Sequence, residues 1–181
     1  MTPLAAFAAF VDRWNDRLGR SLAWLALAMV LVQFVVVVFR YVFGLGWIFV
    51  QESITYMHAV LFMLGAGYTL LHEGHVRVDI FYRDMGPLAK ARVDLFGALL
   101  LLTPFCAIIF VASYPYVLSS WQVFEGSKET SGIHGVFLLK TAILGFSVLM
   151  VLQGLALAAR SALTLAGIAP PEPPAMQRQK V

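Results

Sequence analysis

Four long apolar stretches divide the chain, and short polar segments separate them. They cover about residues 21–43, 48–71, 93–118 and 136–163. At 1.5 Å of helical rise per residue, the first stretch, SLAWLALAMVLVQFVVVVFRYVF, spans roughly 35 Å, which exceeds the roughly 30 Å of a bilayer's hydrocarbon core. None of the four alternates apolar and polar residues as barrel strands do. The pattern therefore predicts four transmembrane helices, the first of them too long for a signal peptide.

The two ends of the chain differ from each other. In residues 1–20, apolar side chains such as Phe10 and Trp14 recur at helical spacing, with most charged residues on the other face. This pattern predicts an N-terminal amphipathic helix in the membrane interface, with a frayed tail as the alternative. Residues 164–181 are rich in proline and polar residues, which predicts a disordered tail. The four-helix membrane domain then covers residues 21–163.

The connector between the second and third stretches is the most polar part of the middle of the chain. Gly74 can end the second helix in a left-handed conformation, and Pro87 suits the first turn of the third. Between them, Phe81 and Met85 are four residues apart, which predicts a short segment on the membrane surface.

Composition supports the same class. The 181 residues are 60% hydrophobic and 13% charged, whereas soluble domains average about 25% charged residues. The chain is therefore predicted to be an all-α integral membrane protein. The formal charge of +3 needs no nucleic-acid partner, because a positive-inside bias accounts for it. The single Cys106 excludes an intrachain disulfide.

Lysine and arginine are unevenly divided between the two sides of the predicted bundle. Ten belong to the N-terminal segment, the connector and the C-terminal end: Arg13, Arg17, Arg20, Arg77, Arg83, Lys90, Arg92, Arg160, Arg178 and Lys180. The other side has three, Arg40, Lys128 and Lys140. This bias places both termini in the cytoplasm.

Charged residues at the ends of the predicted spans are the main candidates for a functional role, because charges inside a bilayer are costly. Arg40 near the end of the first helix and Glu52 near the start of the second lie at similar depth. We expect them to contact each other or a partner subunit, with separate snorkelling into headgroups as the alternative. Lys140 opens the fourth helix in the same setting.

Nothing in the pattern indicates an enzyme, a metal or a cofactor. His58 is the one histidine deep in a predicted span, and it has no histidine partner for a haem. No nucleophile–base set and no phosphate-binding glycine loop occurs. Four helices without an inverted repeat are also few for a midplane substrate site, so we expect a protein partner.

Three segments resemble one family of membrane proteins. They are GWIFVQES, GAGYTLLHEGHVRVDIFY and EGSKETSGIHGVFLLKTAI. In order and placement they are similar to the small membrane subunit, of the DctQ type, of tripartite ATP-independent periplasmic (TRAP) transporters. The likeness covers about residues 21–161. Two positions depart from it: Gln51 stands where an acid is frequent, and His134 where a proline is common.

The resemblance implies a role and partners. A periplasmic binding protein captures an organic acid or related solute, and a large membrane subunit moves it with an ion gradient across the bacterial inner membrane. The small subunit is then a scaffold beside the large one, among membrane lipids. His75, Arg77 and Asp79 are expected to hold the cytoplasmic connector, with a solvated loop as the alternative. Trp47, Glu52, Glu129 and Ser131 are expected to face the periplasm, where the binding protein docks.

Two other functions remain open at this point. One is a self-contained small multidrug-type exporter that uses Glu52 for proton coupling, although such chains are shorter and their acid lies deep in the first helix. The other is a haem or quinone anchor subunit of a membrane redox enzyme.

Overall fold

The computed structural model describes residues 2–76 and 80–174; the residues 1, 77–79 and 175–181 lie outside it. Its elements, in chain order, are α1 (Pro3–Val42), α2 (Ile48–Leu71), α3 (Pro87–Phe96), the π-helical η1 (Gly97–Leu102), α4 (Thr103–Gln122) and α5 (Val136–Leu165). The described residues contain no β-strand. Since α3, η1 and α4 follow each other without a break, the chain has four helices long and apolar enough to cross a membrane. The predicted fold class is confirmed.

Helix α1 is longer than the first apolar stretch. Thr2 caps it, because its hydroxyl accepts a hydrogen bond from Ala5 N at 3.3 Å, and Pro3 suits the first turn. No proline or glycine pair interrupts the next 40 residues, so the helix continues through residue 20 to Val42. Forty residues span about 60 Å, twice the hydrocarbon thickness. The first twenty residues are thus the first half of α1, and their place at the membrane interface stays a prediction.

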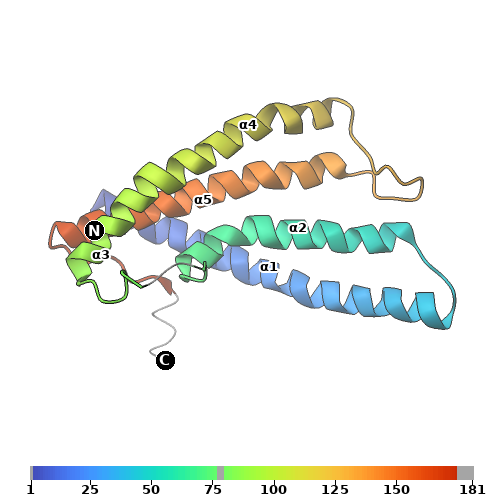
Figure 1. The fold of residues 1–181 in the computed structure, drawn as a ribbon, viewed down its shortest axis with the longest axis horizontal. Coiled ribbons are helices and arrows are strands. Elements are labelled where there is room, and N and C mark those ends of the chain that lie inside the picture. The colour runs from blue at the N-terminus through green and yellow to red at the C-terminus, as the bar shows by residue number, and fades with distance from the viewer. Residues whose placement is uncertain (1, 77–79, 175–181) are drawn as a thin grey trace.

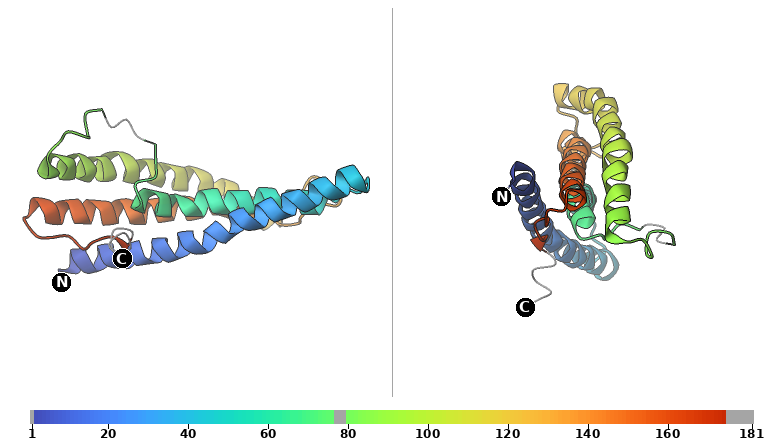
Figure 2. Two further views of the ribbon diagram at one scale, coloured as in Figure 1. Left: turned by 90° about the horizontal axis from the view of Figure 1, so that it is seen from below. Right: turned by 90° about the vertical axis from the view of Figure 1, so that its left-hand side faces the viewer.

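The helices form two hairpins that pack side by side (Figure 1; Figure 2). One hairpin is α1–α2, and the other joins the continuous α3–η1–α4 helix to α5. Helix α5 contacts every other element of the described chain and is the most buried of the four long helices. The start of α1, the end of α5 and the described residues 72–76 and 80–86 of the connector lie at one end of the bundle, which we call the terminal end. The loops 43–47 and 123–135 lie at the other, which we call the loop end.

Small side chains let α5 occupy the middle of the bundle. Ala156 and Ala159 pack against Ala8 and Val11 of α1. On the other side, Met150 packs with Ala66 of α2 and Cys106 of α4. Helices in membranes associate through such close packing, because lipid tails supply no hydrophobic drive between them. The core is accordingly rich in alanine and consists of small clusters between neighbouring helices.

The left-handed residue that follows α2 lies one position earlier than the sequence indicated. Glu73, with φ 54°, adopts the left-handed conformation that was predicted for Gly74. Glu73 N donates to Leu70 O and Gly74 N to Thr69 O, at 3.2 and 2.8 Å. This pair of bonds is the Schellman pattern, in which the residue after the cap is left-handed. The prediction for Gly74 was therefore wrong by one position, whereas Pro87 does begin α3.

Candidate functional site

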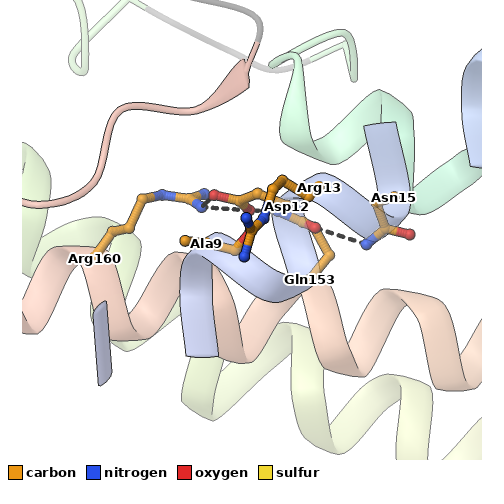
Figure 3. Close-up of polar contacts among 6 residues, drawn as sticks. All are labelled: Ala9, Asp12, Arg13, Asn15, Gln153 and Arg160. Atoms are coloured by element: carbon orange, nitrogen blue, oxygen red, sulfur yellow. Dashed lines mark hydrogen bonds and ion pairs between the residues drawn. The ribbon is translucent and has the colours of Figure 1, made fainter. Parts of the chain in front are cut away.

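The terminal end holds a buried polar network between α1 and α5 (Figure 3). Arg160 Nη1 lies 2.6 Å from Asp12 Oδ1 and 2.5 Å from Oδ2. Gln153 Nε2 donates to Asp12 Oδ1 at 3.0 Å, and Gln153 Oε1 accepts from Asn15 Nδ2 at 2.7 Å. Asp12, Asn15 and Gln153 are almost fully buried. The network therefore joins residues more than 130 positions apart in the sequence and ties the first half of α1 to α5.

A second polar contact joins α1 to α2 at the same end. Asp16 Oδ1 lies 3.3 Å from His72 Nε2, and the Asp16 side chain is 3% exposed. The His72 ring also packs on Tyr68, with 4.0 Å between ring centroids. One face of α1 thus contacts both α5 and α2.

Only part of the charged surface expected for residues 1–20 points into the protein. Asp12 and Asp16 are buried and contact other helices, whereas Arg13, Arg17 and Arg20 are exposed. Phe10 and Trp14 are 63% and 56% exposed. The sequence did hold one indication of this contact between α1 and α5. Gln153 and Arg160 are seven residues apart and therefore lie on one face of a largely apolar helix.

Two glycines make the close approach of α1 and α2 possible. A Cβ at Gly19 would lie 2.2 Å from the Tyr68 ring, and one at Gly67 would lie 2.9 Å from Asn15 Oδ1. Both distances are shorter than any ordinary van der Waals contact. The absence of a side chain at these two positions sets the distance between the helices.

We therefore expect Gly19→Ala to destabilise the folded protein by about 1–3 kcal/mol, because the Tyr68 ring and the helix behind it must move. Unfolding in detergent, followed by tryptophan fluorescence, measures the loss. Gly65→Ala is the matched control, since a Cβ there meets nothing within 4 Å. Equal stability of the two variants would show that the Gly19 contact is not close-packed.

At the loop end, Glu52 of α2 binds the loop between α4 and α5. Its Oε1 accepts from Ser127 Oγ at 2.5 Å, and its Oε2 accepts from Ile133 N at 2.7 Å. Tyr56, one turn further along α2, donates its hydroxyl to Ile133 O at 3.3 Å. Gly132 packs closely against the Glu52 carboxylate: a Cβ at this position would lie only 2.7 Å from Glu52 Oε2. The carboxylate therefore fastens the loop of one hairpin to the helix of the other.

Lys140 makes a second attachment for the same loop. Its Nζ forms an ion pair with Glu125 Oε2 and lies 4.0 Å from the centre of the Tyr116 ring. The Lys140 hydrogen bond holds the pKa of Glu125 below its ordinary value of 4.5. Lys140 is thus paired within the chain rather than extended into headgroups.

Replacing Lys140 by methionine is expected to raise the pKa of Glu125 toward 4.5, because the largest cause of its depression is removed. A carboxylate with a lowered pKa stabilises the fold above its unfolded pKa and loses that contribution as pH falls through the folded value. The Lys140–Glu125 contribution is therefore complete at neutral pH and declines below about 4.5. Carbon-13 NMR titration of labelled glutamate side chains measures the shift. Lys128→Met, which removes only a weaker charge effect, should move the same titration less.

The Arg40–Glu52 pair suggested by the sequence does not form in the described structure. Arg40 Nη2 donates instead to Gln51 Oε1 at 2.9 Å. The physical reason is helical rotation: neighbouring positions on a helix differ by about 100°, so Gln51 faces α1 when Glu52 faces the loop. Gln51, which departs from the acidic residue frequent in the resembling family, is the actual partner of Arg40.

The other candidates from the sequence lie apart from these contacts. Trp47 packs against Phe39 in a tilted arrangement with 5.1 Å between ring centroids, and it is half exposed. Glu129 and Ser131 are exposed on the loop 123–135, where Glu129 N donates to Ser127 Oγ at 3.1 Å. His75 is exposed on the connector. Arg77 and Asp79 lie outside the described residues, so the role expected for them stays a prediction.

The chemistry of these groups is that of structural pairing. Within residues 2–76 and 80–174, no three His, Cys, Asp or Glu side chains form a group that could hold a metal ion. The buried carboxylates Asp12 and Asp16 and the loop-binding Glu52 all have partners within the chain. The fold and its sites define a multi-pass helical membrane protein whose charged groups fasten helices and a loop at the two ends of the bundle.

Comparison with known proteins identifies the family. Residues 29–164 match the DctQ component of the tripartite ATP-independent periplasmic transporters, and the chain belongs to this family of transporter subunits. The match begins inside α1 and ends one residue before the end of α5, so it includes Glu52 and Lys140 but not Asp12. No curated protein and no solved structure matches the chain.

Proposed function

We propose that this protein is the small scaffold subunit of a TRAP transporter. It supports a large membrane subunit during ion-gradient-driven uptake of an organic acid or a related solute, which a periplasmic binding protein delivers. Membership of the DctQ family supports a transport role. In this proposal the chain lies in the bacterial inner membrane, with the basic terminal end in the cytoplasm and the loop end in the periplasm.

The observation that carries the scaffold role is the distribution of charge along the four spans. Asp, Glu, Lys and Arg are absent between Arg20 and Arg40, Glu52 and Glu73, Asp94 and Glu125, and Lys140 and Arg160. An anionic solute or a coupling ion at the bilayer midplane needs charged or converging polar partners. The four spans offer no charged partner at that depth, which favours support of a carrier over carriage itself.

The engagement of Glu52 favours this proposal over a proton-coupled exporter. A coupling carboxylate must exchange protons with a cavity, whereas both Glu52 oxygens accept hydrogen bonds from the loop 123–135. In the scaffold role, this bond presents the loop toward the periplasm in a set conformation. Glu129 and Ser131, exposed on it, are then the residues nearest to a docked binding protein.

Purification of the tagged protein from its native membrane in mild detergent, followed by mass spectrometry, tests the proposal. The expected result is co-purification of a large multi-span membrane subunit. Recovery of the chain alone or only as a homo-oligomer would contradict the proposal. Untagged membrane treated identically is the control for adventitious carry-over.

A further inference from the structure

The outward surface of the α1–α2 hairpin carries polar side chains where a lipid-facing surface is normally apolar. Between Val50 and Leu71, four residues of α2 are exposed: Gln51, Thr55, His58 and Phe62. Their spacing of four, three and four places them on one face of the helix. Three of the four are polar, although they lie on the outer surface of a membrane-spanning helix.

Helix α1 continues the same surface. Gln33 and Arg40 are exposed, and their spacing of seven residues puts them on one side of α1. The bond from Arg40 to Gln51 joins the two helix faces at the loop end. Seven residues deeper along each antiparallel helix, or about 10 Å, Gln33 and His58 therefore lie at similar depth. We call this surface, formed by Gln33, Arg40, Gln51, Thr55 and His58, the polar face.

The polar groups of this face are incompletely paired inside the chain. Neither the Gln33 amide nor the His58 ring has a hydrogen-bond partner among the described residues, and His58 only stacks against Phe62. The Arg40 guanidinium uses one N–H on Gln51 and has four more donors. Snorkelling explains Arg40 at the membrane boundary, but Gln33 and His58 lie too deep for their short side chains to reach it. An amide without a hydrogen-bond partner in hydrocarbon is costly, so polar residues within spans face protein or water rather than lipid.

The opposite side of the bundle shows the contrast. Every exposed residue between Phe96 and Ala112, along the end of α3, η1 and the first half of α4, is apolar. Lipid acyl chains can cover that surface, and it needs no protein partner. The two outer surfaces of the bundle therefore differ in the chemistry of what can cover them.

We propose that the polar face is the surface that packs against a transmembrane segment of the large subunit, with the apolar α4 surface left to lipid. This inference rests on the proposed function and adds the side of the chain that the partner occupies. The partner segment is expected to present hydrogen-bonding groups at the depth of Gln33 and His58, and an acceptor such as a carboxylate or free helix-end carbonyls near Arg40.

Cross-linking from single cysteines in the native membrane tests the assignment. Cys106 is the single cysteine and is fully buried, so Cys106→Ala provides the background. Thr55→Cys places a thiol on the polar face at little change in volume, and Ile108→Cys, at a residue 66% exposed, places one on the α4 surface. Each is labelled with a thiol-reactive benzophenone, irradiated and analysed by mass spectrometry.

The proposal expects an adduct with the large subunit from position 55 and only lipid adducts from position 108. A large-subunit adduct from position 108, from both positions equally or from neither would overturn the assignment of the face. An adduct between two copies of this chain at position 55 would overturn it too. Co-purification of the large subunit, scored on the same samples without irradiation, separates these outcomes from a failure of the proposed function, in which no large subunit is present at all.

A second variant measures the energetic role of the face. Gln33→Leu with His58→Leu makes the hairpin more apolar, so membrane insertion is not impaired. We expect about tenfold less large subunit to be retained in detergent, because two interhelical hydrogen bonds are lost. Leu101→Ile with Val111→Leu, on the α4 surface, is the control and should retain it fully. Undiminished retention by the Gln33/His58 variant would contradict a role for these two side chains.

Discussion

Arg160→Met is expected to destabilise the folded protein by about 3–5 kcal/mol, because it leaves the Asp12 charge buried without its partner. Asp12 is 1% exposed, and the Arg160 guanidinium contacts both of its carboxylate oxygens. Gln153 remains as a neutral donor to Asp12 but brings no positive charge. Equilibrium unfolding in detergent, with CD for helix content, measures the loss.

The double variant Asp12→Leu with Arg160→Met separates pairing from packing. When both charges are replaced by apolar side chains of similar size, no uncompensated charge remains, and most of the stability lost in Arg160→Met should return. A double variant as unstable as the single one would show that the Arg160 side chain acts through packing alone. Arg13→Met, at an exposed position of α1 next to Asp12, is the control and should change the stability very little.

Glu52→Gln is expected to release the loop 123–135 from α2 while leaving the helices in place. The amide keeps one acceptor oxygen, but its NH₂ group then faces either Ser127 Oγ or the Ile133 N–H, and the charge that strengthened both bonds is gone. Hydrogen–deuterium exchange should become about tenfold faster at Ile133 and neighbouring amides, because local opening is no longer opposed by these bonds. Exchange in the middle of α5 should not change.

The same variant separates the scaffold from the exporter interpretation. If Glu52 is a loop anchor, Glu52→Asp should also loosen the loop, since the shorter side chain cannot reach both donors. If Glu52 were a proton-coupling group, Glu52→Asp would keep titratable chemistry and retain function. Unchanged loop exchange in Glu52→Gln, together with abolished proton-driven transport by this chain alone, would contradict the anchor role.

The sequence predicted the helices well because hydropathy decides them locally. The bounds of α2, Ile48–Leu71, match the second apolar stretch. The third helix begins at Pro87, as the proline indicated, six residues before the apolar stretch that starts at residue 93, because its first turns carry the charged residues Lys90 and Arg92 and give no apolar signal. The helix in residues 1–20 was predicted from its amphipathic spacing, but its continuation into the first span was not, although no residue interrupts the helix between Pro3 and Val42.

The contacts between residues far apart in the chain could not be predicted from the sequence, because they depend on how the helices pack. Asp12 and Arg160 are 148 positions apart, and only the packing of α1 across α5 brings them together. Sequence spacing indicated that Glu52 and Arg40 lie at similar depth in the membrane. The rotation of α2 about its axis nevertheless places Gln51, not Glu52, in hydrogen-bond contact with Arg40. Depth follows from residue number, whereas the direction of a side chain depends on which neighbouring helix or loop it meets.

In the proposed role this chain supports a carrier without carrying solute itself. Uptake into proteoliposomes, with the binding protein and its captured solute outside and an ion gradient imposed, distinguishes the two roles. We expect no uptake by this chain alone, little by the large subunit alone, and full uptake when both are reconstituted together. Solute or proton-coupled transport by this chain alone would contradict it, as would full uptake by the large subunit without it.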